Sequence, residues 1–429
     1  MMILRWLLAL ILDVAYLVGG LLALAISPLR GRAAAKWDHV KRRVLAAYPR
    51  RDGDRPCLWV HGVSVGEVLA ARELVARFRA AKPDWDVVIS SSTKLGVEAA
   101  TKAYTDDIVV SYPMDFSLRV ASAFRKLRPA YVLIVEHDLW PNFLAKAKAS
   151  GVPCALINAK MSEGSASFLA KIRYVFPWPP RHLRLFTQDG ESADRFEALG
   201  FENVVRSGSL KFDGPVPAGS EGLRGERGYA ADDWIFLAGS THEGEEEAAL
   251  DAFALLKRQS DNLRLILVPR RIERTQDVAK FVEASGFTCG LWSEGAGRDV
   301  DVVVVDTMGE LAKISGMADA VFVGGTLAPV GGHNVIEPAV LGKPVLVGPH
   351  FFNAKDVVRR FVERDAIVVV QSSADLTSEV SKLRAEPDRA RSLGERAAEV
   401  VKENLGATER VLQSILSDVE TLPDLGAED

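Results

Sequence analysis

The chain has 429 residues, more than the about 250 to 300 residues at which single cores usually stop growing, so two domains are expected. Its composition, 48% hydrophobic and 26% charged with a formal net charge of −4, is that of a globular α/β protein and argues against a nucleic-acid partner. The three cysteines, Cys57, Cys154 and Cys289, are odd in number and far apart, which excludes a disulfide framework and a CxxC zinc site and indicates buried thiols.

An apolar run over residues 6–26 stands near the start of the chain, with Asp13 as its one charged residue. At 1.5 Å per residue a helix of this length spans a hydrocarbon core of about 30 Å. The alternatives are a cleaved signal peptide and a helix lying in the membrane interface. Because basic residues are concentrated after the run rather than before it, we expect a transmembrane anchor over residues 1–30, a basic linker over residues 31–56, and the rest of the chain in the cytoplasm.

From Cys57 onward, short apolar and β-branched runs alternate with helical patterns, which is typical of parallel sheets built from βαβ units. Seven strands are predicted in the first half, at residues 57–63, 86–92, 107–113, 130–136, 153–159, 183–189 and 204–210. Seven more are predicted in the second half, at residues 234–240, 263–269, 287–293, 300–306, 320–326, 343–349 and 366–372. A segment rich in Gly, Pro and charge separates the two series. We therefore expect two doubly wound α/β domains, residues 57–212 and 231–420, joined by a linker over residues 213–230 and facing each other across a cleft.

The first predicted strand runs into Ser64-Val65-Gly66-Glu67, which has the spacing of a helix capping box. In such a box the Ser hydroxyl accepts a backbone N–H three residues on, and the Glu carboxylate reaches back to the N–H of the Ser. Ligands of open α/β sheets bind at the carboxyl ends of the strands, where this turn lies. Glu67 is therefore either only a cap or a carboxylate placed for chemistry.

Two more candidates follow strands of the first half. Glu136, His137 and Asp138 stand at the end of one predicted strand and are candidates for acid, base or metal ligand, or for a cap of the next helix. Lys211 follows the last strand before the linker and is expected to point toward the cleft, although an isolated Lys is usually solvated.

The second half opens on a similar turn, in which Ser240 and Glu243 repeat the capping-box spacing. The densest candidate in this half is the segment over residues 323–349, where two Gly pairs precede a helix predicted to begin at Asn334. Glycines let backbone amides approach a ligand, and a helix amino end favours an anion. A phosphate there, with Glu337 on a ribose hydroxyl, fits a nucleotide-linked donor. The alternative is a tight loop with His333 as a hydrogen-bonded turn residue.

Two smaller groups of the second half also follow strands. Arg270, directly after Pro269, offers a planar fork suited to phosphate, or else belongs to a solvated helix start. Met308 either contacts a base ring or packs in the core. The chain contains neither a GxGxxG after a strand nor a GxxxxGK[ST] motif, so dinucleotide and P-loop functions lack their fingerprints.

Eight motifs in order cover nearly all of residues 57–355: VSVGE, EHDLWPN, NAKMSEGS, GSLKFD, GSTHEGEEE, LVPR, DTMGEL and FVGGTLAPVGGHNVIEPAVLGKPVLVGPHFFN. Together they resemble the Kdo (3-deoxy-D-manno-octulosonic acid) transferases of lipopolysaccharide assembly. The resemblance implies a GT-B type fold of two facing Rossmann-like domains with an N-terminal transmembrane helix at the cell inner membrane. It also implies CMP-Kdo as donor, a lipid A precursor as acceptor, and inverting chemistry that needs no metal and no cofactor.

Carried over by position, the resemblance implies that Glu67 is the general base and that Glu136 and Lys211 assist the transition state. It implies a donor site for CMP made by Pro269, Arg270, Met308, Gly309, Glu310, Asn334, Val335, Ile336 and Glu337. The chain departs from the family pattern at His137 and Asp138, where the family commonly shows Thr and Glu.

Three alternatives remain open at this point. Another GT-B transferase or an epimerase, either one using a UDP-sugar, would have similar nucleotide loops, and a membrane-tethered binding protein would keep the fold without catalysis. Turnover with CMP-Kdo against UDP-sugars distinguishes them.

Overall fold

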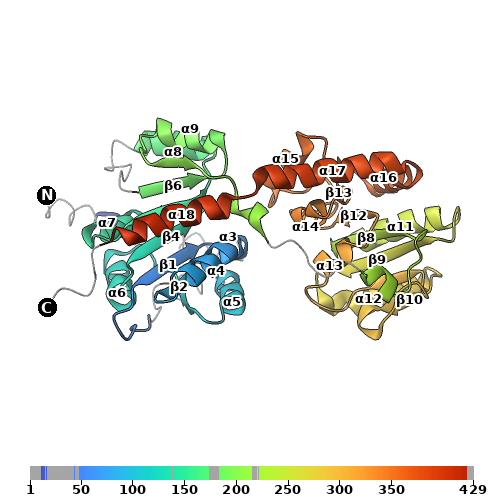
Figure 1. Cartoon of the computed structure of the whole chain (residues 1–429), viewed down its shortest axis with the longest axis horizontal. Coiled ribbons are helices and arrows are strands. Elements are labelled where there is room, and N and C mark those ends of the chain that lie inside the picture. Colours follow the sequence, from blue (N-terminus) through green and yellow to red (C-terminus); the bar gives the residue numbers. More distant parts are fainter. Residues whose placement is uncertain are drawn as a thin grey trace. The chain divides into compact units, whose positions relative to one another are not determined.

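The computed structural model divides the chain into two compact units, each built on its own sheet (Figure 1). Unit 1 is Met1–Gly214 with Leu405–Asp429, and unit 2 is Pro215–Asn404. The structure describes residues 11–14, 16, 43, 48–137, 139–172, 183–214, 220 and 222–422. The predicted anchor and basic linker therefore lie for the most part outside the described residues. Among the residues that are described, no helix is both long and apolar enough to cross a membrane.

Unit 1 contains a seven-stranded parallel sheet with the strand order β3-β2-β1-β4-β5-β6-β7. Its strands are β1 (Cys57–Gly62), β2 (Asp86–Ser91), β3 (Ile108–Ser111), β4 (Tyr131–Val135), β5 (Cys154–Ala159), β6 (Leu183–Thr187) and β7 (Val204–Arg206). Leu58 of β1 lies between Val87 of β2 and Tyr131 of β4. The strand order reverses between β1 and β4, and such a switch point is where open α/β sheets bind ligands.

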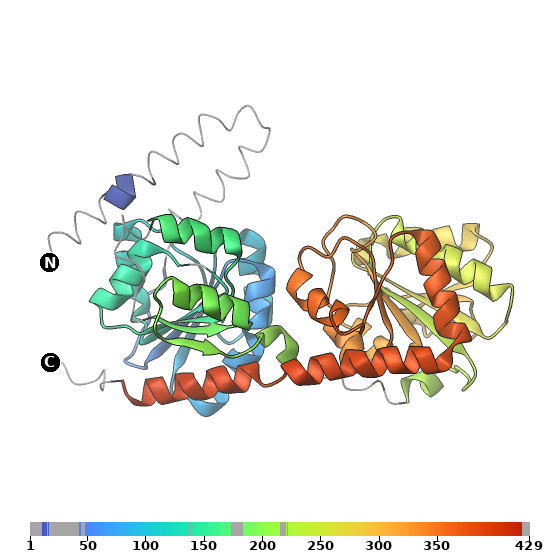
Figure 2. The same cartoon turned by 90° about the horizontal axis from the view of Figure 1, so that it is seen from above.

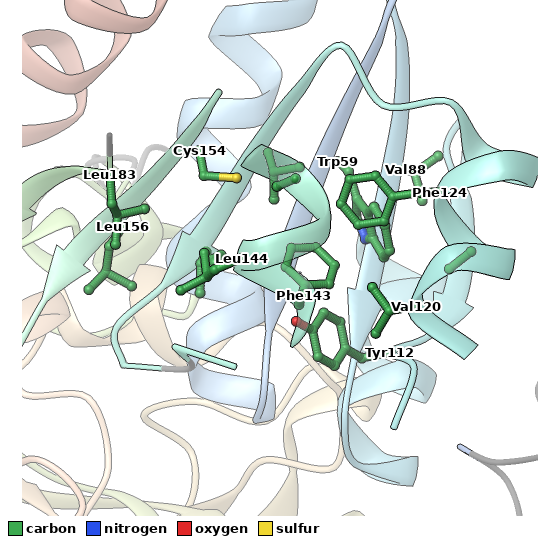
Figure 3. Close-up of a cluster of buried hydrophobic side chains, with 14 of the residues drawn as sticks. Trp59, Val88, Tyr112, Val120, Phe124, Phe143, Leu144, Cys154, Leu156 and Leu183 are labelled. Atoms are coloured by element: carbon green, nitrogen blue, oxygen red, sulfur yellow. The ribbon is translucent and has the colours of Figure 1, made fainter. Parts of the chain in front are cut away.

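Alternation along β1 sends its side chains into two separate cores. Trp59 belongs to the core under α6 (Ser117–Leu127), α7 (Pro141–Ala149), α8 (Glu163–Ile172) and α9 (Gly190–Ala198). Figure 3 shows its ring among Phe124, Phe143 and Tyr112, with the Phe143 ring centroid 5.1 Å away. Leu58 belongs to the opposite core, under α3 (Val65–Ala70), α4 (Arg72–Ala81), α5 (Lys94–Ala103) and α18 (Ala407–Glu420).

Unit 2 repeats this plan with a parallel sheet in the order β10-β11-β9-β8-β12-β13-β14. Its strands are β8 (Trp234–Thr241), β9 (Leu263–Pro269), β10 (Cys289–Leu291), β11 (Val302–Val304), β12 (Ala320–Val323), β13 (Val345–Val347) and β14 (Val368–Val369). Its helices are α10 (Leu223–Glu226), α11 (Glu245–Lys257), α12 (Thr275–Ala284), α13 (Leu311–Ser315), α14 (Ile336–Val340), α15 (Lys355–Val362), α16 (Ser373–Ala385) and α17 (Pro387–Asn404). The switch point here lies between β8 and β12. All fourteen predicted strands are present.

The second domain was predicted to extend to residue 420, but the last helix, α18, packs on unit 1 instead (Figure 2). Its apolar face, which includes Val411 and Ile415, lies in the core that also contains Leu58. Asp213 accepts the backbone N–H groups of Gly406 and Thr408 at the start of the helix. The chain therefore passes twice between the units, after Gly214 and after Asn404.

The predicted linker over residues 213–230 is also shorter than expected. Part of it, residues 215–219 and 221, lies outside the described residues. Downstream of that part, α10 and the buried Tyr229 already belong to unit 2. The guanidinium of Arg224 bonds to the Asp233 carbonyl and lies 3.3 Å from the Asp319 carboxylate, which ties this segment to the start of β8 and to β12.

Asp13, the one charge in the N-terminal apolar run, lies against unit 1. Its carboxylate accepts the backbone N–H of Ser117 at 3.0 Å and the side-chain amide of Asn142 at 3.1 Å. Tyr16 donates its hydroxyl to Asp115 at 3.2 Å. The described part of the run therefore contacts the amino ends of α6 and α7.

Candidate active site

Glu67 is held in the turn between β1 and α3 by both of its carboxylate oxygens. Oε2 accepts the backbone N–H of Val63 at 2.7 Å, and Oε1 accepts the Ser64 hydroxyl at 2.9 Å. The Ser64 hydroxyl in turn accepts the N–H of Glu67 at 3.4 Å. The predicted capping box is thus present with one change, since the carboxylate reaches the N–H of Val63 rather than that of Ser64. Glu67 is only 5% exposed.

Glu136 directly follows β4, and Asn158 is the next-to-last residue of the adjacent strand β5; both have left-handed backbone conformations, φ 68° and 53°. Such conformations cost free energy in residues other than glycine and often mark functional sites. The Asn158 side chain donates to Glu136 Oε1 at 3.3 Å and accepts the backbone N–H of Leu210 at 3.1 Å. The Nζ atom of Lys211 lies 2.7 Å from Glu136 Oε1. Glu136 and Lys211, both predicted to assist the transition state, therefore form an ion pair. Asn158, for which no role was predicted, also bonds to Glu136.

Glu67, Glu136 and His137 come together at the switch point between β1 and β4. One ligand-type atom from each lies within 4.8 Å of the others. Burial raises the pKa of Glu67 most, and the neighbouring Glu136 raises it further, whereas the bonds from Val63 and Ser64 and the nearby His137 oppose the rise. A carboxylate with a raised pKa is a better proton acceptor near neutral pH.

These three side chains also have the donor types that bind a metal ion. The ammonium group of Lys211, 2.7 Å from Glu136, places a positive charge beside them, and this charge opposes a divalent cation. Metal-independent chemistry remains a prediction. Asp138 lies outside the described residues.

The turn after β8 differs from the predicted one, because Glu245 and not Glu243 is the capping carboxylate. Gly244, with φ 87°, delays the start of α11 to Glu245. Glu245 accepts the backbone N–H of His242 at 2.9 Å, whereas Glu243 is exposed. The expected role of Glu243 as a cap is therefore wrong. The spacing between Ser240 and Glu243 could not predict that Glu245 is the cap, because it carries no information on the left-handed conformation of Gly244.

Asn334 and Glu337 meet at the end of the Gly-rich loop that follows β12. The Asn334 side chain accepts the N–H of Ile336 at 3.0 Å and donates to Glu337 Oε1 at 3.0 Å. The helix that follows, α14, begins at Ile336, two residues after the predicted start, and has five residues. Burial raises the pKa of Glu337, and the bond from Asn334 opposes that rise.

The other predicted donor residues lie at the ends of neighbouring strands of unit 2. Pro269 ends β9, and the backbone N–H of Arg270 donates to Thr241 at 3.0 Å while its side chain is exposed. Met308 is 80% exposed, so it does not pack in the core. Its neighbours are Gly309, in a left-handed conformation, and Glu310, which precedes α13. All nine predicted donor residues are in unit 2, and Glu67, Glu136 and Lys211 are in unit 1.

A hollow of about 540 Å³ in unit 1 lies far from these strand ends. Pro56, Pro129 and Val152, which line it, precede β1, β4 and β5. The hollow therefore opens at the amino edge of the sheet. Arg51, its most buried cation, is bonded to Asp86 and to backbone carbonyls. The hollow contributes nothing to the site at the carboxyl edge.

Sequence relatives identify the family. The family described as 3-Deoxy-D-manno-octulosonic-acid transferase (kdotransferase) matches residues 38–214. The 3-deoxy-D-manno-octulosonic acid transferase of Haemophilus influenzae is 32% identical over 366 residues, which cover 83% of this chain and 85% of that protein. The chain belongs to the Kdo transferase family. It is therefore a glycosyltransferase, and the alternative of a non-catalytic binding protein is set aside.

Solved structures agree with this fold. The UDP-GlcNAc 2-epimerase of Neisseria meningitidis bound to UDP-GlcNAc has a TM-score of 0.55 at 12% identity and covers 84% of this chain and 100% of that one. At that identity the likeness shows the GT-B type fold alone. The C-terminal CMP-Kdo binding domain of WaaA from Acinetobacter baumannii is 30% identical, with a TM-score of 0.41, and covers 42% of this chain and 95% of that domain.

Proposed function

We propose that this Kdo transferase moves Kdo from CMP-Kdo to a lipid A precursor in lipopolysaccharide assembly, with inversion at the anomeric carbon and Glu67 as the general base. The observation that carries the proposal is the buried Glu67, with its raised pKa, beside the Glu136–Lys211 ion pair at the switch point of unit 1. The donor and the acceptor come from the family resemblance.

The chemistry needs a proton acceptor because a sugar hydroxyl is a poor nucleophile. As the acceptor oxygen bonds to the anomeric carbon of Kdo, its proton passes to the Glu67 carboxylate. The bond between that carbon and the phosphate oxygen breaks, and CMP leaves with the electron pair. Within the described part of the chain, Glu67 accepts hydrogen bonds from Val63 and Ser64 only, and a carboxylate oxygen that accepts one hydrogen bond retains a lone pair for a proton.

Glu136 and Lys211 are proposed to support this step rather than to exchange the proton. The ammonium group of Lys211 lies 2.7 Å from Glu136 Oε1 and offsets the negative charge of that carboxylate. The negative charge of Glu136 disfavours a second charge on Glu67 and so raises the pKa of Glu67. Loss of Lys211 would leave two carboxylates close together without a compensating cation.

CMP is proposed to bind at the strand ends of unit 2. The exposed fork of Arg270 suits the phosphate, and the Asn334–Glu337 pair suits the ribose hydroxyls. Replacing Arg270 or Glu337 by Ala is expected to weaken CMP binding by about 1 to 3 kcal/mol, measured by calorimetry. Unchanged affinity in both variants would remove this loop from the donor site.

The proposal includes a single-pass anchor over residues 1–30 at the inner membrane, with the catalytic units on the cytoplasmic side. The apolar run over residues 6–26 and the basic residues after it support the anchor.

One assay tests the reaction directly. Purified enzyme is incubated with a tetra-acylated lipid A precursor and either CMP-Kdo or a UDP-sugar, and the lipid is analysed by mass spectrometry. A mass increase that depends on CMP-Kdo and persists in a chelator is expected. Transfer from the UDP-sugar alone would replace the proposed donor, and loss of activity with the chelator would contradict the metal-independent mechanism.

A further inference from the structure

A buried carboxylate in unit 2 has no part in the proposed reaction, yet it receives five backbone hydrogen bonds. Glu245 is 1% exposed. Its Oε2 accepts the N–H groups of His242 at 2.9 Å and Gly325 at 2.7 Å. Its Oε1 accepts those of Thr326 at 2.9 Å, Leu327 at 2.9 Å and Ala328 at 3.1 Å. Four of the five donors belong to the turn directly after β12.

Successive amide groups that point at one place form a nest, and nests in nucleotide-binding proteins often hold phosphate. Here a carboxylate of the protein itself occupies the nest. We infer that Glu245 is a positioning residue, an internal anion that fixes the Gly-rich loop leading to Asn334 and Glu337. The amides of residues 325–328 are therefore not available to the donor phosphate. The role of Glu245 in the loop does not depend on the proposed function. Only the expected effect on CMP binding rests on the proposed donor site.

The glycine before the nest is needed for this approach. A Cβ atom at Gly324 would lie 2.8 Å from Glu245 Oε2 and 2.6 Å from the carbonyl oxygen of Ser240. Gly325 has φ 69°, a conformation that other residues rarely adopt. The amides of the second Gly pair also have an acceptor within the loop, because the N–H groups of Gly331 and Gly332 donate to the carbonyl of Gly325 at 3.0 and 2.7 Å. The glycines thus shape the loop around an internal partner, and not around the phosphate expected from the sequence.

The other end of the loop is tied to the same turn. His242, whose N–H donates to Glu245, has its Nε2 atom 2.9 Å from Nε2 of His333. The pKa of His333 is lowered to about 4 by burial first and then by Arg270 and His242. With both imidazoles neutral, one ring donates this hydrogen bond and the other accepts it. Asn334 follows His333 directly, so the geometry of the donor residues depends on both contacts.

The test replaces the carboxylate without changing its shape. In Glu245→Gln the amide group presents N–H donors to a nest of N–H donors, and part of the nest loses its acceptor. We expect backbone hydrogen exchange at residues 325–328 to rise about tenfold or more. We also expect CMP affinity to fall about tenfold and the KM for the donor to rise, with a smaller change in kcat.

Glu246→Gln is the matched control. Glu246 is the next residue, is 3% exposed, and bonds to Arg274 and Thr241 instead of to the loop. Its replacement is expected to lower stability without raising exchange at residues 325–328. Wild-type exchange in a folded Glu245→Gln protein would overturn the inference, as would equal exchange increases in both variants.

Chemical rescue gives a second readout. In Glu245→Ala, added formate is expected to refill the nest and slow exchange at residues 325–328, with no such effect on Glu246→Ala. If Glu245→Gln does not fold, Glu245→Asp takes its place, and exchange equal to wild type in that variant together with an absence of formate rescue would overturn the inference. If wild-type enzyme does not bind CMP, the proposed donor site fails while the exchange experiment still decides the role of Glu245.

Discussion

At the scale of single residues, Glu67 combines a structural and a chemical role in one side chain. Its carboxylate closes the turn between β1 and α3 through Val63 and Ser64, and it also lies beside Glu136. The two roles require different properties of the group. Capping needs only an acceptor, which Gln also offers, whereas proton transfer needs the carboxylate.

Glu67→Gln is therefore expected to lower kcat by about 10² to 10⁴-fold with little change in melting temperature. The Gln oxygen still accepts the N–H of Val63, and its amide group can donate to Ser64. Kinetics with CMP-Kdo, calorimetry with CMP and thermal unfolding are the measurements. Glu243→Gln, at an exposed position, is the control and should leave all three unchanged. Near-normal turnover by folded Glu67→Gln would limit this residue to capping.

A second prediction concerns Ser64 and the pH dependence of the reaction. The Ser64 hydroxyl stabilises the charged form of Glu67 and lowers its pKa, so Ser64→Ala should raise that pKa further. A general base works only when deprotonated, and the acid limb of kcat/KM should therefore move to higher pH in the variant. At pH values above both limbs the variant should approach wild-type activity. An acid limb at the same pH in both proteins would show that Glu67 is not the titrating base.

At the scale of secondary-structure elements, α18 illustrates how a helix at the end of the chain can complete a domain that begins far earlier. Its buried residues lie in the core of unit 1. Arg184 of β6 bonds to the Asp418 carboxylate at 2.7 Å, and the hydroxyl of Tyr131 of β4 donates to the same side chain at 2.7 Å. Apolar packing and this polar cluster both hold α18 on unit 1.

Ile415→Ala should accordingly destabilise unit 1 by about 2 to 5 kcal/mol, because Ile415 is 0% exposed and its loss leaves a cavity. Ser417→Ala, at an exposed position of the same helix, is the control. Hydrogen exchange resolved by segment should show faster opening of β1 and β4 and unchanged exchange in β8 and β12. Destabilisation confined to unit 2 would contradict the assignment of α18 to unit 1.

At the scale of the whole molecule, the two units repeat one design. Each has a parallel sheet with a switch point beside its first strand, although β11 lies between β10 and β9 in unit 2. At each switch point a Glu accepts backbone N–H from a strand-end turn, one group at Glu67 in unit 1 and several at Glu245 in unit 2. In unit 1 the carboxylate also adjoins Glu136, whereas in unit 2 it is enclosed by amides. A Glu that accepts backbone N–H at a strand-end turn is therefore proposed to accept a proton in unit 1 and to fix the Gly-rich loop in unit 2.

The membrane anchor is a prediction for the complete chain. Protein lacking residues 1–28 is expected to fold and to partition away from phospholipid vesicles far more than the full chain, since the apolar run supplies most of the binding free energy. Sedimentation with vesicles measures this partition. If protein expressed from the full sequence is soluble and has been cleaved after Ala25, the run is a signal peptide instead.

Sequence pattern located all fourteen strands and placed Glu67, Glu136 and Lys211 at strand ends. Glu67 and Glu136 follow the neighbouring strands β1 and β4, so their proximity follows from the common edge at which parallel strands end. Lys211 lies in a 3₁₀ helix beyond the edge strand β7, and only the tertiary structure brings it to Glu136. Asn158 could not be assigned in the same way. Its role depends on a left-handed backbone at the end of β5 and on contacts with both Glu136 and Leu210, 22 and 52 residues away.

The sequence by itself determined the sheets, the family and the positions of the candidate side chains, because apolar periodicity and motif spacing are local properties of the chain. Only the tertiary structure decided that α18 completes unit 1 and that Glu245, and not Glu243, receives the loop amides. Both depend on groups brought together from distant parts of the chain: Asp213 with Gly406, and Glu245 with Gly325. From the sequence alone, an amphipathic helix or a carboxylate could contact many other segments of the chain. The fold of the chain determines which one of these contacts forms.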